Sequence, residues 1–224
     1  MKRTKLADRV LPTYTKGEEI FNMVSHIVGG VAGIVTIVLC SVFGAIRGNS
    51  YGVVSGVIFG VSMIFLYTMS SLYHGLKPNS KSKKVFQILD HCAIFILIAG
   101  SYTPFALCTL REYSATLGWV IFGVIWAFAI LGITLNAIDL KKYKVFSMIC
   151  YLAMGWCIIV RGDLLPKLLG INGFALLLTG GIVYTIGAIL YGIGKKRKYV
   201  HSVFHLSVFL GNLLHVLCVL IYVM

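Results

Sequence analysis

Charged residues are scarce in this chain: 12% of its 224 residues are Asp, Glu, Lys or Arg, and 58% are hydrophobic. Soluble domains carry about 25% charged residues, so this composition excludes an ordinary soluble globular domain. Acidic residues are rarer still, with 7 against 20 Lys and Arg, which gives a formal net charge of +13. Such a charge usually indicates nucleic-acid binding, but a mean hydropathy of +0.91 leaves little polar surface to contact DNA.

Long apolar runs without charge separate the charged clusters. A membrane-spanning helix needs about 20 apolar residues, whereas barrel strands would alternate in polarity, which these runs do not. Seven runs qualify, and they cover residues 27–46, 51–73, 92–110, 113–138, 145–160, 168–193 and 200–224. The sequence therefore predicts an all-α, multi-pass protein of the cell membrane, with residues 1–224 forming one seven-helix domain and residues 1–18 its polar N-terminal segment.

Lysine and arginine are divided unevenly between the two sides of this bundle. With seven spans, sixteen of the twenty fall on one side and four on the other, so the positive-inside rule predicts a cytoplasmic N-terminus and an extracellular C-terminus. The same charges predict contact with anionic lipid head groups at the cytoplasmic face and no nucleic-acid partner. The sixteen are Lys2, Arg3, Lys5, Arg9, Lys16, Lys77, Lys81, Lys83, Lys84, Lys141, Lys142, Lys144, Lys195, Lys196, Arg197 and Lys198.

Small residues recur at helical spacing inside the first two spans. Gly29 and Gly33 are four residues apart, as are Gly52, Gly56 and Gly60. Such ladders let membrane helices approach closely, so we expect these two spans to pack through their glycines. The six cysteines form no CxxC pair and are predicted to be small core residues.

A few polar side chains lie within the predicted helices or at their ends, where burial is costly and therefore indicates function. Their spacings, i to i+3, i+4 or i+7, place those of one helix on one face. With the predicted topology they gather near the cytoplasmic leaflet. The set consists of Glu19, Asn22 and His26 in the first helix, Ser70 and His74 in the second, Asp90 in the third, and His201 and His205 in the seventh.

These residue types favour a zinc site. Two histidines at i and i+4, such as His201 and His205, form a recurrent chelating pair for zinc, and His74 would supply a third ligand. Three protein ligands leave a fourth position for water, as in catalytic zinc sites. Asp90 could accept a proton from that water or orient it, and Ser70 could hydrogen-bond to the water or to the substrate.

Structural explanations stand beside these roles. Asp90 can pair with a lysine of the second loop or cap the third helix, His201 lies at a loop edge, and Ser70 can bond to its own backbone. His215 lies about 15 Å along the helix from His205, too far to share its metal. The polar residues of the first helix are interpreted as a hydrogen-bond cluster that supports the site: Glu19, Asn22 and His26.

Taken in order, these motifs resemble the hemolysin III family, the bacterial branch of the progestin and adipoQ receptor superfamily that includes the adiponectin receptors. The resemblance covers nearly the whole chain, including the stretch from Leu89-Asp90-His91 to Ser101-Tyr102-Thr103-Pro104-Phe105. It implies a seven-helix bundle with a cytoplasmic N-terminus. It also implies zinc on the residues matching His74, His201 and His205, with Asp90 and Ser70 beside the bound water.

Three functions remain open at this point. Superfamily members are linked to amide hydrolysis of ceramide-like lipids, which implies a zinc-dependent intramembrane hydrolase of lipid amides or esters. The family name comes from haemolytic activity, which implies a pore-forming cytolysin. The third possibility is a receptor or sensor whose zinc is structural, although the short loops leave no sizeable cytoplasmic domain to carry a signal.

Overall fold

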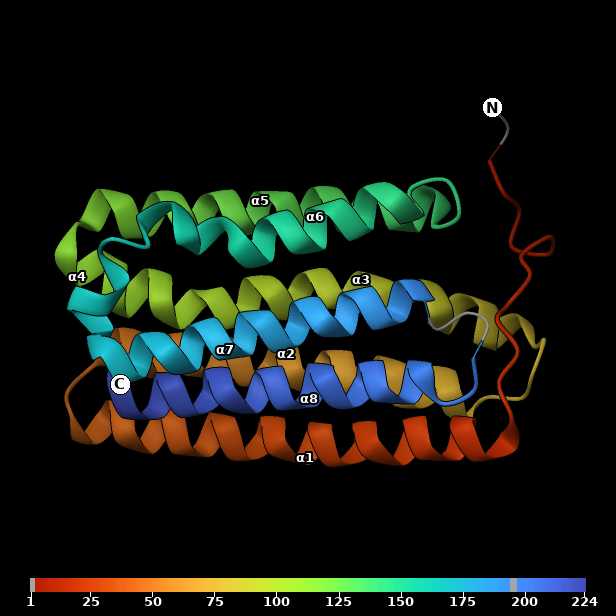
Figure 1. Cartoon of the computed structure of the whole chain (residues 1–224), viewed down its shortest axis with the longest axis horizontal. Helices are drawn as coiled ribbons and strands as arrows, with labels where there is room; N and C mark the ends of the chain where they lie inside the picture. Colours follow the sequence, from red (N-terminus) through yellow and green to blue (C-terminus); the bar gives the residue numbers. More distant parts are fainter. Residues whose placement is uncertain (1–2, 194–196) are drawn as a thin grey trace.

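The predicted all-α membrane fold is confirmed by a computed structural model, which describes residues 3–193 and 197–224. In these residues seven helical segments are long and apolar enough to cross a membrane. They run side by side along the long axis of the molecule (Figure 1). Three of the charges used above to predict the orientation, Lys2, Lys195 and Lys196, lie outside the described residues.

The seven spans follow the apolar runs of the sequence, and three of them change helix type near their ends. The third span continues past Pro104 as a π-helical segment, Phe105–Leu110. The elements are α1 (Lys16–Ile46), α2 (Ser50–Gly75), α3 (Lys81–Pro104) with η1 (Phe105–Leu110) and α4 (Arg111–Tyr113), α5 (Ala115–Asp139), α6 (Lys144–Trp156) with 3-10 segment η2 (Cys157–Arg161), α7 (Leu165–Ile193), and α8 (Val200–Cys218) with π-helical η4 (Val219–Val223).

Helix α1 begins well before its apolar run. Thr15 accepts a hydrogen bond from the Glu18 backbone, and the Glu18 side chain accepts one from the Thr15 backbone, which completes a capping box. Glu18 also accepts a hydrogen bond from the Tyr199 backbone at 2.7 Å, which ties the start of α1 to the start of α8. The early start makes the polar residues of the first motif part of a continuous helix.

The helices pack in layers, with α3 at the centre. Figure 1 shows α5 and α6 along one side, α3 and α7 in the middle, and α1, α2 and α8 along the other. Helix α3 is the most buried span: 83% of its most apolar window lies inside the protein, against 50% or less in every other span. The outer faces of the other helices carry exposed apolar side chains suited to lipid, for example Ile34, Val54, Ile130 and Ile186.

Helices α1 and α2 meet through their glycines, as the sequence predicts. A Cβ atom added to Gly33 would lie 3.0 Å from the Gly60 carbonyl oxygen, and one added to Gly60 would lie 2.8 Å from the Gly33 oxygen. One added to Gly56 would lie 2.2 Å from Cys40 Cβ. The two backbones are therefore too close for side chains at these positions, which brings the polar ends of α1 and α2 together.

Helices α1, α3, α6 and α8 begin at one end of the bundle, and α2 finishes there. We call this end, which lies on the right in Figure 1, the site end. The N-terminal segment, residues 3–15, crosses this end. The backbone N–H of Thr4 donates to Asp139 at 2.7 Å, and the Arg9 guanidinium donates to Gln87 at 2.6 Å. These bonds attach the segment to α5 and α3.

Candidate metal centre

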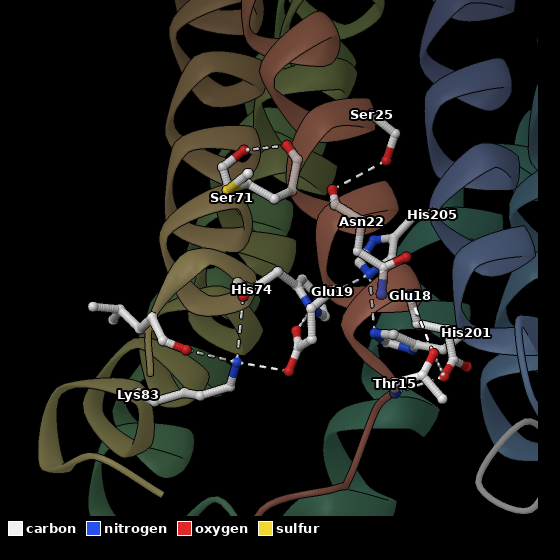
Figure 2. A network of polar contacts seen from close by, with 12 residues as sticks. Thr15, Glu18, Glu19, Asn22, Ser25, Ser71, His74, Lys83, His201 and His205 are labelled. Atoms are coloured by element: carbon white, nitrogen blue, oxygen red, sulfur yellow. Dashed lines mark hydrogen bonds and ion pairs between the residues drawn. The ribbon is translucent and has the colours of Figure 1, made fainter. Parts of the chain in front are cut away.

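Three histidines from two distant parts of the sequence converge at the site end. His74 Nε2 lies 3.1 Å from His205 Nε2, which lies 2.9 Å from His201 Nε2 (Figure 2). One ligand atom from each of the three lies within 4.8 Å of the others, so the cluster can hold a metal ion. All three residues are at least nine-tenths buried.

The contacts among these rings fit a bound cation. A neutral imidazole nitrogen carries either one hydrogen or one lone pair. If His74 Nε2 presents a lone pair, His205 Nε2 must donate its hydrogen to it, and it then has no lone pair left to accept a hydrogen bond from His201 Nε2. A cation at the centre would satisfy all three nitrogens. Zinc–nitrogen bonds of about 2.0–2.1 Å in a tetrahedron put ligand nitrogens about 3.3 Å apart, close to the separations observed.

Glu19 lies behind this cluster and contacts residues of two other helices, which its spacing in the sequence did not predict. Its Oε2 accepts a hydrogen bond from His74 Nδ1 at 2.7 Å, and its Oε1 accepts one from Lys83 Nζ at 2.8 Å. Lys83 was counted in the sequence among the loop charges, yet only 2% of it is exposed. No sequence signal distinguished it, because it belongs to a cluster of similar lysines.

Asn22 and His26 do not form the expected hydrogen-bond cluster with Glu19. Successive turns of a helix are about 5.4 Å apart, and Glu19 binds His74 of α2 and Lys83 of α3 instead. Among the described residues, the side chains of Asn22 and His26 have no hydrogen-bond partner, although both are buried. The His26 ring packs edge-on against His205, with ring centroids 4.1 Å apart, so it borders the cluster.

Tyr14 covers the cluster from the N-terminal segment. Its ring stacks on His201 with centroids 4.8 Å apart and an interplanar angle of 17°. Burial raises the pKa of the Tyr14 hydroxyl well above its usual value. No pattern in the sequence pointed to this residue, because it precedes the first helix and belongs to none of the motifs.

Asp90 belongs to α3. It is the tenth residue of that helix, and Ser80 caps the helix, so the capping role considered for Asp90 is wrong. Among the described residues, the basic side chain found near its carboxylate is the His91 imidazole, with Nδ1 at 3.8 Å, rather than a loop lysine. Asp90 and His205 line the same cavity, which is otherwise bounded mostly by apolar side chains.

Ser70 lies one helical turn before His74 and is fully buried. The described residues offer its hydroxyl no hydrogen-bond partner, so the alternative considered for Ser70, a bond to its own backbone, is not formed. The structure therefore brings His74, His201 and His205 together, places Glu19 behind them, and places His26 and Asp90 at the border of the cluster and the cavity.

Comparison with known proteins assigns the fold to a family. The sequence pattern of haemolysin-III-related proteins matches residues 14–216. The chain belongs to this family. Hemolysin-3 of Bacillus cereus is 40% identical over 207 residues, which cover 92% of each chain. The Hemolysin-3 homolog of Bacillus subtilis is 39% identical over 209 residues, or 93% of this chain and 96% of that protein.

The family has distant relatives outside bacteria. The human monocyte to macrophage differentiation factor is 24% identical over 163 residues, which cover 70% of this chain and 66% of that protein. The matched region of the family pattern begins at Tyr14 and includes every candidate site residue named above. Hemolysin III membership and the seven apolar helices together make this a multi-pass membrane protein.

Proposed function

We propose that this protein is a zinc-dependent hydrolase of lipid amides or esters. One observation carries the proposal: a buried cluster of three imidazoles adjoins a largely apolar cavity that also contains a carboxylate, Asp90. Three nitrogen ligands are typical of catalytic zinc sites. An apolar cavity between membrane helices suits the acyl chain of a lipid.

The chain supplies distinct groups for the reaction. His74, His201 and His205 would hold Zn²⁺, which when bound polarises a carbonyl group and lowers the pKa of water to about 7. Asp90, on the cavity wall beside His205, accepts the proton that the attacking water loses and returns it to the leaving group. Ser70 donates a hydrogen bond from its buried hydroxyl to the substrate or to the water.

The site end faces the cytoplasm in this proposal. Sixteen of the twenty Lys and Arg residues lie on that side of the seven spans, and short cationic loops are retained in the cytoplasm. The same charges attract anionic lipid head groups. The lipid carbonyl would therefore be cleaved near the inner leaflet, with its chain in the cavity.

The test combines metal analysis with lipid analysis for the wild-type protein and the Asp90→Asn variant. Both proteins are expected to contain about one zinc per chain, and only the wild type should release fatty acid from membrane lipids in mass-spectrometric comparison. Asp163→Asn is the matched control, because Asp163 is exposed and pairs with Arg161 far from the cavity. Wild-type protein without zinc, or equal lipid products from Asp90→Asn, would contradict the proposal.

Membrane lysis is a second candidate function, favoured by the 40% identity to Hemolysin-3 of Bacillus cereus. Purified protein would then release dye from liposomes. Because lysis by a pore does not need the metal, the His74→Ala variant should release dye as fast as the wild type. Dye release that disappears in His74→Ala would instead favour the hydrolase.

A further inference from the structure

Lys83 is a buried cation at the edge of the proposed zinc site. Its ammonium group donates to Glu19 Oε1 at 2.8 Å, to the Leu76 carbonyl at 3.2 Å and to the His74 carbonyl at 3.4 Å. It also lies 5.0 Å from the centre of the Tyr73 ring. Lysines are almost never fully buried unless they are paired. The burial of Lys83 therefore depends on these partners at the site end.

Glu19 divides its two oxygens between a cation and a histidine. One oxygen accepts from Lys83, and the other accepts from His74 Nδ1 at 2.7 Å (Figure 2). A carboxylate can only accept, so His74 must carry its hydrogen on Nδ1, which leaves the Nε2 lone pair directed at His205. Histidines that bind metals are typically fixed in this way by a carboxylate.

The other two histidines of the cluster have different surroundings. Among the described residues, His205 Nδ1 has no hydrogen-bond partner, and His201 is packed beneath the Tyr14 ring. Of the three, His74 is thus the one whose tautomer a carboxylate determines within the described part of the chain. It is also the ligand that comes from a different helix than the other two, so its orientation decides whether the three nitrogens meet.

We propose that Lys83 and Glu19 are positioning residues of the zinc site, with Lys83 acting through Glu19 on His74. This inference rests on the zinc site proposed above. Lys83, at the start of α3, fixes the Glu19 carboxylate of α1, which fixes the tautomer and orientation of the His74 ring of α2. Three helices thereby set the direction of one ligand, and the affinity for the metal depends on a residue that does not touch it.

The test is a zinc titration of purified full-length protein and four variants. Glu19→Gln and Lys83→Met are each expected to weaken zinc binding about 10–100-fold, the usual effect of losing a partner behind a metal ligand. The double variant should bind zinc no more weakly than Glu19→Gln alone, because Lys83 acts through Glu19. It also removes the Glu19 charge, which Lys83→Met leaves without its cation and which could prevent that variant from folding.

Lys84→Met is the matched control. Lys84 is the neighbouring residue on the same helix, but it donates to the Ala7 carbonyl, outside the site. Its Kd for zinc should equal that of the wild type. The ¹⁵N shifts of the His74 ring should report hydrogen on Nδ1 in the wild type and a mixture of tautomers in Glu19→Gln.

The outcomes separate the two proposals. If the wild type binds no zinc, the proposed function is wrong and this inference with it. If the wild type binds zinc and Lys83→Met binds it equally well, only the positioning role is wrong. Effects of the two substitutions that multiply in the double variant would also contradict it. A lower melting temperature without a change in Kd would make the ion pair merely structural.

Discussion

His205 is the central residue of the candidate metal centre, and replacing it tests the centre most directly. Its Nε2 lies within 3.1 Å of the Nε2 atoms of both His74 and His201. The His205→Ala variant removes one ligand and leaves two. His215→Ala is a matched control, because His215 is equally buried on the same helix but donates to the Leu177 carbonyl, outside the cluster.

The expected effect can be estimated from ligand loss. Four-ligand zinc sites contribute about 10–16 kcal/mol, so one ligand accounts for about 2.5–4 kcal/mol, or about 10²–10³ in affinity. At a free zinc concentration about 100 times its Kd, the wild type gains about 2.7 kcal/mol. At about 2–4 °C per kcal/mol for a chain of this size, zinc should raise the melting temperature by about 5–11 °C. His205→Ala at the same zinc concentration gains at most about 0.4 kcal/mol.

The assay is thermal unfolding in detergent with buffered zinc and with a chelator. The difference between the two melting temperatures isolates metal binding from the destabilisation that any truncation of a buried histidine causes. Zinc should shift the wild type and His215→Ala equally and His205→Ala by less than about 2 °C. An undiminished shift in His205→Ala, or its loss in His215→Ala, would refute the assignment of the metal centre.

Two further predictions concern the cover of the site and the cavity. Tyr14→Ala removes the ring stacked on His201, so a soluble chelator should strip zinc at least about tenfold faster with little change in Kd; an unchanged rate would show that the ring does not limit access. Gly181→Leu places a side chain in the cavity beside Trp156, because a Cβ atom there would lie 3.7 Å from that ring. It should shift the lipid products toward shorter acyl chains at normal zinc content, whereas Gly123→Leu, which has open space around it and lies outside the cavity, should not.

Much of the fold could be predicted from the sequence because it depends on local properties. The length and apolarity of each run fixed the number of spans, and helical periodicity placed Ser70 with His74 and His201 with His205 on shared faces. The boundary of α1 was less predictable. Hydropathy marks the apolar part of a helix, whereas the start of α1 depends on the capping box of Thr15 and Glu18.

The composition of the site depended on contacts between helices. Periodicity suggested that Glu19, Asn22 and His26 act together, but Glu19 binds His74 and Lys83 instead. A sequence does not show which of several adjacent lysines turns inward. Lys83 does so because the Glu19 carboxylate of another helix lies beside it. A sequence also does not show which aromatic ring of a polar segment will cover the metal ligands.

The sequence alone determined that this is a seven-helix membrane protein of the hemolysin III family, because scarce charge and regular motif spacing are visible in one dimension. Only the tertiary structure decided that α2 and α8 bring ligand atoms of His74, His201 and His205 within 4.8 Å of one another. It also decided that Asp90 lines a cavity rather than capping its helix. The physical reason is that burial in a bundle is shared among helices, and the partners of a buried polar group come from whichever helices pack beside it.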